Sequence, residues 1–99
     1  MQQYLIHAYD YTDAQAIERR MAVRPLHLEL MEKFKVSGNY VLGGAILDAQ
    51  GKMIGSNLVL QFETREELDA YQAEEPYIQN KVWEKITITP FRVATVAAS

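Results

Sequence analysis

The sequence predicts a single α+β domain whose elements follow one another as strand, helix, strand, strand, helix and strand. Runs of branched and aromatic residues mark the strands, and segments with apolar residues at helical spacing lie between them. The chain has 99 residues, which is enough for one domain and too few for two. Hydrophobic residues make up 48% of it and charged residues 23%, as in ordinary globular proteins, so one folded domain is expected over residues 1–99.

The first part of the chain predicts a strand followed by a long helix. Residues 4–9 have the aromatic and branched side chains of a strand. Thr12 and Gln15 have the spacing of a capping box, in which each side chain bonds to the other residue's backbone N–H. Because Pro25 lacks an N–H, a kink or a restart is expected there, and the helical region is expected to end near Gly38. The apolar residues at helical spacing are Ile17, Met21, Leu28 and Met31.

A hairpin is predicted next. Residues 40–47 and residues 53–63 are nearly continuous apolar runs, which is typical of strands that are covered on both faces. Residues 48–51 lie between them, with Asp first and Gly last, and this pattern suits a short turn. The two runs are therefore expected to pair as antiparallel strands.

The last part of the chain predicts a short helix and a final strand. Thr64 and Glu67 form a second capping box, and the helix that begins there is expected to stop before Pro76. Residues 74–81 are expected to form a loop. Residues 82–93 alternate in polarity and are expected to form the last strand.

This order of elements predicts the ferredoxin-like β-α-β-β-α-β arrangement. Right-handed crossovers place both helices on the same side of a four-stranded antiparallel sheet, so the other face has no cover within the chain. An exposed apolar face of that size usually meets a partner. We therefore expect a homodimer with two sheets packed face to face, and we expect His7 to lie on that face or in the core. In the first strand, both alternating sets are largely apolar: Tyr4, Ile6 and Ala8 against Leu5, His7 and Tyr9.

The composition argues against several classes of function. The chain has no cysteine, which excludes thiol catalysis and cysteine-held metals. Its two histidines lie on separate elements without a close-spaced ligand motif, and no phosphate-binding loop is present, so neither a metal nor a cofactor is expected. The net charge of −3 is spread along the chain, which argues against a nucleic-acid surface. No signal peptide or membrane-spanning apolar run is visible, so a cytoplasmic location is expected.

The residues best suited to chemistry lie in the long helix. At about 100° per residue, Arg20, Arg24 and His27 share one narrow helical stripe beside the apolar face. An imidazole can move a proton in either direction near neutral pH. Two cations beside it suit an anionic or phenolic ligand in a cleft between helix and sheet. The alternative interpretation is a histidine at the edge of the core with two solvated arginines.

Several short motifs together resemble the YciI-like, or YCII-related, proteins. The resemblance runs along nearly the whole chain and implies a single YCII-related domain with a dimeric α/β-barrel fold. It also implies an active site that pairs a His with an Asp, and one branch of the family is a dehydrochlorinase of chlorinated hydroxyquinols. The motifs are Arg20, Arg24-Pro25-x-His27-Leu28, Gly43-Gly44-x-x-Leu47-Asp48-x-x-Gly51, Gly55-Ser56, Pro76-Tyr77 and Pro90-Phe91-Arg92.

The resemblance carries over to individual residues. His27 matches the family His, and Glu75 stands where the family Asp precedes the Pro-Tyr segment. Glutamate keeps the carboxylate but reaches about one bond further, and it could orient the imidazole. Ser56, next to Gly55 on a strand, and Tyr77 could line the same pocket as Arg20 and Arg24. The alternatives are a surface acid at Glu75 and a structural role for Ser56.

Two functions from different classes follow. In the first, the protein is a cofactor-independent enzyme of lyase, isomerase or dehydrochlorinase type that acts on a small, possibly aromatic substrate. His27 would then be the acid or base, Glu75 would orient it, and Arg24 would hold negative charge. In the second, the protein is a non-catalytic dimer that binds a small ligand or a protein partner. The first function requires His27 and Glu75 to lie within hydrogen-bond reach, whereas the second requires only a pocket.

Overall fold

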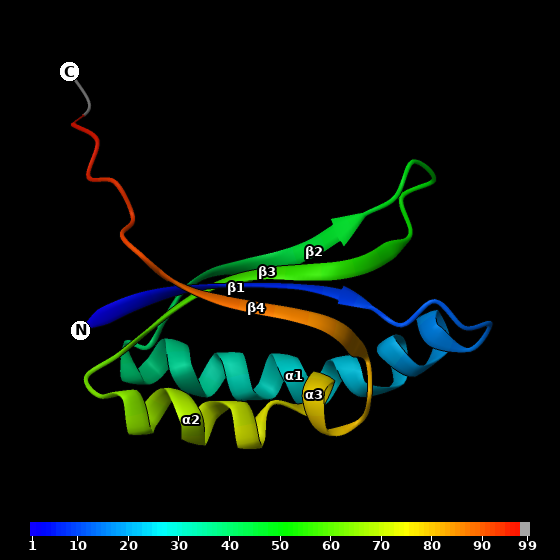
Figure 1. Cartoon of the computed structure of the whole chain (residues 1–99), viewed down its shortest axis with the longest axis horizontal. Helices are drawn as coiled ribbons and strands as arrows, with labels where there is room; N and C mark the ends of the chain where they lie inside the picture. Colours follow the sequence, from blue (N-terminus) through cyan, green and yellow to red (C-terminus); the bar gives the residue numbers. More distant parts are fainter. Residues whose placement is uncertain (98–99) are drawn as a thin grey trace.

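The computed structural model describes residues 1–97 and has the predicted α+β, ferredoxin-like arrangement (Figure 1). A four-stranded antiparallel sheet is covered on one side by two helices, and a one-turn helix precedes the last strand. Across these residues, none of the helices combines the length and the apolarity needed to span a bilayer. The elements are β1 (Gln2–Asp10), α1 (Ala16–Ser37), β2 (Tyr40–Leu47), β3 (Met53–Phe62), α2 (Arg65–Glu74), α3 (Pro76–Gln79) and β4 (Trp83–Phe91).

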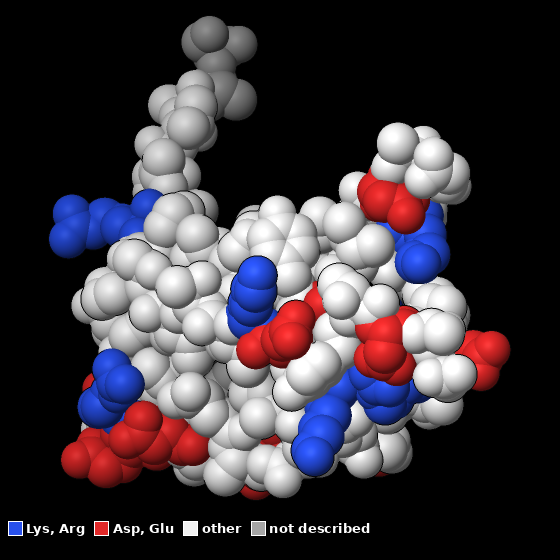
Figure 2. Space-filling model, turned by 45° about the vertical axis from the view of Figure 1, so that its right-hand side comes forward, with Lys and Arg blue, Asp and Glu red and all other residues white. Residues whose placement is uncertain are grey.

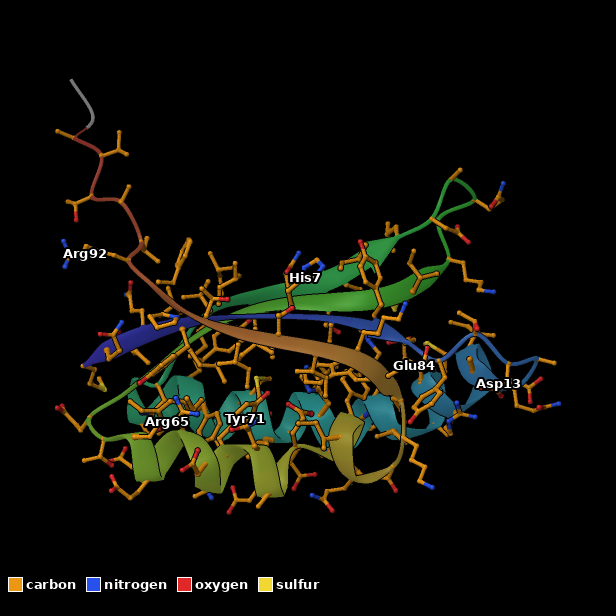
Figure 3. The ribbon with its side chains drawn as sticks, viewed as in Figure 1. His7, Asp13, Arg65, Tyr71, Glu84 and Arg92 are labelled. Atoms are coloured by element: carbon orange, nitrogen blue, oxygen red, sulfur yellow. The ribbon has the colours of Figure 1, made fainter. Side chains whose placement is uncertain are left out.

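The sheet has the strand order β2-β3-β1-β4, with every neighbouring pair antiparallel. Alternate residues of β1 point to opposite faces. Tyr4, Ile6 and Ala8 are buried toward the helices, and Ile6 and Ala8 are 0% exposed. His7 lies on the other face, away from α1 and α2 (Figure 3). The prediction that both helices cover the same face is therefore confirmed.

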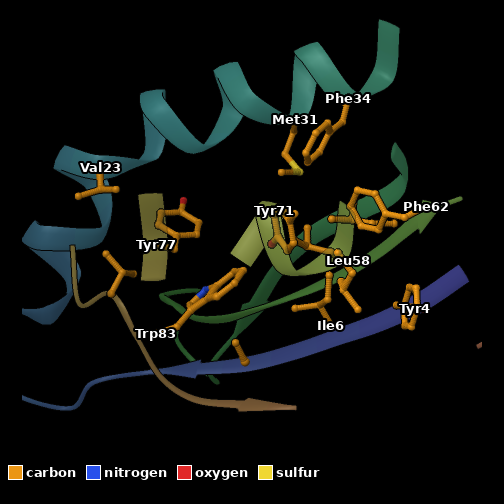
Figure 4. Close-up of a cluster of buried hydrophobic side chains, with 14 residues drawn as sticks. Tyr4, Ile6, Val23, Met31, Phe34, Leu58, Phe62, Tyr71, Tyr77 and Trp83 are labelled. Atoms are coloured by element: carbon orange, nitrogen blue, oxygen red, sulfur yellow. The ribbon is translucent and has the colours of Figure 1, made fainter. Parts of the chain in front are cut away.

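The core lies between this sheet face and the helices (Figure 4). The face of α1 that packs on the sheet contains Val23, Met31 and Phe34. The prediction of which face of α1 is buried was wrong in part, because Met21 is 48% exposed and Leu28 is 45% exposed. The stripe that contains Arg20 and His27 is buried instead, since each of these side chains has a carboxylate partner inside the protein.

The start of α1 and its proline differ from the prediction. The helix begins at Ala16, and Gln15 at its N-terminal boundary makes no side-chain cap; the Gln15 N–H donates to Asp13 at 3.2 Å instead. The helix continues through Pro25 without a restart. Val23 and His27, on either side of the proline, are both buried against the sheet and anchor the helix there. Their burial offsets the one backbone hydrogen bond that proline cannot make.

The second capping site is confirmed in its first half, because the N–H of Glu67 donates to the Thr64 hydroxyl at 3.2 Å. The predicted loop over residues 74–81 was wrong in part, since it contains the short helix α3. Proline at the first position of α3 already has the helical φ angle, and the Glu75 side chain accepts a hydrogen bond from the Tyr77 N–H. This cap fixes the Glu75 carboxylate inside the protein.

The surface drawn in Figure 2 has lysine and arginine side chains next to aspartate and glutamate side chains. One ion pair on the surface joins Arg19 and Asp13 at 2.9 Å, and another joins Arg65 and Asp69 at 3.2 Å. Exposed pairs of this kind contribute little to stability, because water screens the two charges. The contacts that shape a site are therefore the buried ones.

Candidate functional site

A cavity of about 140 Å³ lies between α1 and the half of the sheet formed by β2 and β3. Its volume is close to that of a cavity of about 150 Å³ that holds one benzene ring. Leu28, Met31 and Leu58 give the cavity apolar walls. Gly43 also lines the cavity, and Leu58 packs against its backbone so closely that a Cβ there would lie 2.5 Å from Leu58 Cδ2. The cavity therefore suits a molecule of one ring.

Five of the six site residues suggested by the sequence line this cavity. Glu75, the sixth, is 0% exposed and lies behind His27 rather than at the cavity surface. The five lining residues come from helix α1, strand β3 and helix α3, which are far apart in the sequence. The five lining residues are Arg20, Arg24, His27, Ser56 and Tyr77.

The Glu75 carboxylate holds the imidazole of His27 from behind. The Nδ1 atom of His27 lies 2.7 Å from Glu75 Oε1. The Tyr71 hydroxyl donates to Oε2 at 2.7 Å, and the Tyr77 N–H donates to Oε1 at 3.1 Å. Because the carboxylate accepts in these contacts, Nδ1 carries the imidazole proton that it donates to Glu75. The longer side chain of glutamate thus reaches the histidine.

The ring of His27 is fixed in orientation as well as in tautomer. It stacks on the Tyr77 ring with centroids 4.2 Å apart and an angle of 16° between the planes. The Trp83 ring meets it edge-on at 6.2 Å. Within residues 1–97 the other ring nitrogen, Nε2, has no hydrogen-bond partner and is not fully buried, and the His27 side chain lines the cavity. This nitrogen can take or give a proton at the cavity.

Tyr71 is the buried phenol that supports the Glu75 carboxylate. Burial raises the pKa of Tyr71 well above its ordinary value of 10.0, and the negative charge of Glu75 raises this pKa further. The phenol therefore keeps its proton in the folded protein and remains a donor to the carboxylate.

This raised pKa predicts a loss of stability in alkali. Above about pH 10 the unfolded chain releases the Tyr71 proton while the folded chain keeps it, so the free energy of unfolding falls as the pH rises. In Tyr71→Phe this proton is absent. Above that pH the free energy of unfolding of the variant is therefore expected to fall less steeply than that of the wild type, by up to about 1.4 kcal/mol per pH unit. Urea unfolding of both proteins at about pH 9, 10 and 11 measures the difference. Parallel curves would contradict a protonated, buried Tyr71.

A second buried network fixes Arg20. Its Nη1 donates to both carboxylate oxygens of Asp10, at 2.9 Å and 3.1 Å, and its Nη2 donates to Ser56 Oγ at 2.8 Å. The Trp83 Nε1–H donates to the same Ser56 oxygen at 3.2 Å. Burial raises the pKa of Asp10, and the charge of Arg20 and its hydrogen bond oppose that rise. Arg20 is thus held by partners within the chain, although its side chain lines the cavity.

Sequence reasoning did not identify Asp10 or Trp83 as part of the site. A signal for Asp10 was present, since it continues the alternation of β1 toward the helix face after Ala8. Trp83 is the single tryptophan of the chain. Both residues position others, since neither lines the cavity.

Arg24 is the cation that the site leaves available. The ion pairs among the described residues involve Arg19, Arg20, His27 and Arg65, and not Arg24. Arg24 is half-buried and lines the cavity. A negative charge on a ligand would therefore be most stable near its guanidinium.

Other places offer less chemistry. A larger hollow, of about 340 Å³, lies at the end of the sheet near Tyr9, Ile17 and Lys52. No histidine lines this hollow, and Asp10, which does line it, already accepts a hydrogen bond from Arg20. In the part of the chain that the structure describes, no group of three or more His, Asp or Glu residues could hold a metal ion. The cavity at His27 is therefore the better candidate for chemistry.

Solved structures with the same fold include two informative neighbours. One is a 5-chloro-2-hydroxyhydroquinone dehydrochlorinase from Burkholderia phenoliruptrix in complex with 2,5-dihydroxybenzoquinone, with a TM-score of 0.79, 20% identity, and coverage of 93% of this chain and 95% of the other. Another is a dimeric ferredoxin-like protein of unknown function from Jannaschia sp. CCS1, with a TM-score of 0.59, 11% identity, and coverage of 94% and 100%. At these identities the neighbours support the fold.

Sequence comparison supports the family. The chain is 28% identical over 95 residues to Protein YciI of Escherichia coli O6:H1, which covers 90% of this chain and 95% of that protein. The model of the YCII-related domain matches residues 2–92, nearly the whole chain. The resemblance found in the short motifs is confirmed, and this chain belongs to the YCII-related domain family.

Proposed function

We propose that this protein is a cofactor-independent enzyme that uses His27 and Glu75 for acid-base chemistry on a small, one-ring substrate. The observation that carries the proposal is the 2.7 Å contact between His27 Nδ1 and the buried Glu75 carboxylate, in a side chain that lines the cavity and whose Nε2 has no partner. A carboxylate on one imidazole nitrogen fixes the tautomer in which the other nitrogen is a base. A histidine needed only for packing would not require a free nitrogen at a cavity.

The reaction would begin with the transfer of a substrate proton, from O–H or C–H, to His27 Nε2. The electron pair left behind would move into the substrate, where Arg24 would stabilise the negative charge. In an elimination this pair would form a double bond and expel chloride with the electrons of the C–Cl bond. In an isomerisation the imidazolium would return the proton to another atom. Both courses match the lyase, isomerase or dehydrochlorinase class.

The first experiment uses the substrate named for the structural neighbour. Purified protein is mixed with 5-chloro-2-hydroxyhydroquinone, and with a panel of chlorinated phenols, lactones and enols. Chloride release and proton NMR report the reaction. We expect turnover of at least one compound that fits a cavity of about 140 Å³. Binding of several compounds without turnover of any would favour the binding-module alternative.

We also propose that the protein is a homodimer joined by the uncovered sheet face. The register places Leu5 beside Val59, and Val59 beside Leu42, on the face opposite the helices. Tyr9 is on the same face and 43% exposed, and Leu42 is 51% exposed. A chain of this size gains stability from extra burial. The Jannaschia neighbour is a dimeric protein of the same fold.

A matched pair of leucines tests the dimer. Sedimentation of the wild-type protein is expected to give about twice the chain mass of 11.3 kDa. Leu42→Glu places a charge in the proposed interface and is expected to give a monomer, because a buried unpaired charge is strongly unfavourable. Leu26→Glu, at a residue that is 54% exposed on α1, is expected to remain dimeric. A monomeric wild-type protein, or equal behaviour of the two variants, would refute this interface.

A further inference from the structure

The hydroxyl of Ser56 has an unusual set of partners. Arg20 Nη2 donates to its oxygen at 2.8 Å, and Trp83 Nε1 donates to the same oxygen at 3.2 Å. A guanidinium and an indole N–H can only donate. A hydroxyl oxygen has two acceptor positions, so both positions of Ser56 are filled. Its own O–H must then point away from both neighbours.

The cavity is the open space that borders Ser56. Within residues 1–97, no acceptor is recorded for the Ser56 proton, although the side chain is only 2% exposed. Ser56 lines the same cavity as His27. Its cross-strand neighbour on the β2 side is Ala45, which is small and leaves room there. A buried hydroxyl proton without a partner is unfavourable, so a ligand or a water in the cavity must accept it.

We infer that Ser56 is a fixed hydrogen-bond donor to the ligand, and that the ligand presents to it the ionised oxygen of a phenol or enol. The inference rests on the proposed function for its site and adds the role of Ser56 and the ionised state of the ligand oxygen that it contacts. Arg24 supplies the available positive charge at the same cavity. Ser56 and Arg24 would hold the oxygen while His27 Nε2 takes the proton. A ligand group that can only donate, such as an ammonium, would find no acceptor at Ser56.

Arg20 and Asp10 act as positioning residues in this arrangement. The two hydrogen bonds to Asp10 keep the guanidinium in place, so that it donates to Ser56 Oγ and does not turn toward the ligand. A charged donor on the oxygen polarises the hydroxyl and makes its O–H a stronger donor. The strength of the Ser56 donor therefore depends on the buried ion pair behind it.

The test uses two probes of nearly the same shape. In 4-nitrotoluene a methyl group replaces the hydroxyl of 4-nitrophenol, and the absorbance of the latter reports whether the bound form is phenol or phenolate. We expect wild-type protein to bind 4-nitrophenol as the phenolate. Ser56→Ala is expected to bind it about 10- to 100-fold more weakly, as for loss of a hydrogen bond to a charged group. The affinity for 4-nitrotoluene is expected to change less than about threefold.

Val82→Ala is the control for a structural effect. It shortens a buried side chain that is 1% exposed and does not line the cavity, and it leaves Ser56 and its hydrogen-bond partners in place. Its affinity for 4-nitrophenol is expected to stay within about threefold of wild type. The inference is overturned if the wild-type protein does not bind 4-nitrophenol, if the probe binds as neutral phenol, or if Ser56→Ala binds it equally well. These are equilibrium measurements, so failure of His27 as a catalyst would not alter them.

Discussion

His27→Gln is expected to lower the turnover of any substrate of this protein by about 10² to 10⁴, the usual contribution of a general acid or base. Glutamine can still bond to the Glu75 carboxylate, which lies 2.7 Å from His27 Nδ1. An amide has no basic nitrogen, so glutamine cannot take a proton at the cavity. The variant is therefore expected to fold and to bind ligands, and to lose chiefly kcat.

The second histidine is a matched control for this prediction. His7 is half-buried on the uncovered sheet face, and its Nδ1 lies 2.7 Å from the Asn57 side chain. It does not line the cavity at His27. His7→Gln is expected to keep nearly wild-type turnover and to change stability or pairing of subunits. If His27→Gln has wild-type kcat on a confirmed substrate, the catalytic role of His27 is refuted.

Glu75→Ala is expected to lower the free energy of unfolding by about 3–5 kcal/mol, because each buried donor left without an acceptor costs about 1–3 kcal/mol. The carboxylate is 0% exposed and accepts from His27, Tyr71 and the Tyr77 N–H. Its removal leaves these buried donors without an acceptor and opens a space behind the histidine. Because small domains are stable by only about 5–15 kcal/mol, the variant is expected to unfold at much lower urea.

The neighbouring glutamate gives the control for this second variant. Glu74 is exposed at the end of α2, and Glu74→Ala is expected to change the free energy of unfolding by less than about 0.5 kcal/mol. Glu75→Asp shortens the side chain by one bond and is expected to fall between wild type and Glu75→Ala. Equal unfolding curves for Glu74→Ala and Glu75→Ala would mean that the buried carboxylate does not hold this part of the fold.

The order of the elements could be predicted from periodicity, but the buried face of α1 could not. Met21 and Leu28 are apolar at helical spacing, yet they are exposed. Arg20 and His27 are polar, yet they face the sheet and are 2% and 6% exposed. A pattern of hydropathy cannot show this, because burial of a polar side chain depends on partners distant in sequence. Pro25 misled for the same reason, since tertiary packing outweighs one lost hydrogen bond.

The residues of the site could be predicted, but the hydrogen bonds that hold them could not. Glu75 was identified only through the family resemblance, because its own neighbourhood reads as an acidic loop. Its cap on α3 and its contact with Tyr71 depend on the fold. Asp10 and Trp83 were missed, although they determine how Arg20 and Ser56 are held. That the Ser56 proton has no acceptor could be seen only in the structure, because the two donors to its oxygen come from other elements.

The tautomer of His27 decides whether the cavity contains a base, and NMR of the imidazole nitrogens measures this tautomer directly. The chain has only two histidines, so His7→Gln assigns the signals. In the neutral ring of His27, long-range proton–nitrogen correlations are expected to show the proton on Nδ1 and a bare Nε2. Addition of a phenolic ligand is expected to shift the Nε2 signal and leave the proton on Nδ1. A neutral ring with its proton on Nε2 would contradict the account, because the cavity would then contain no base.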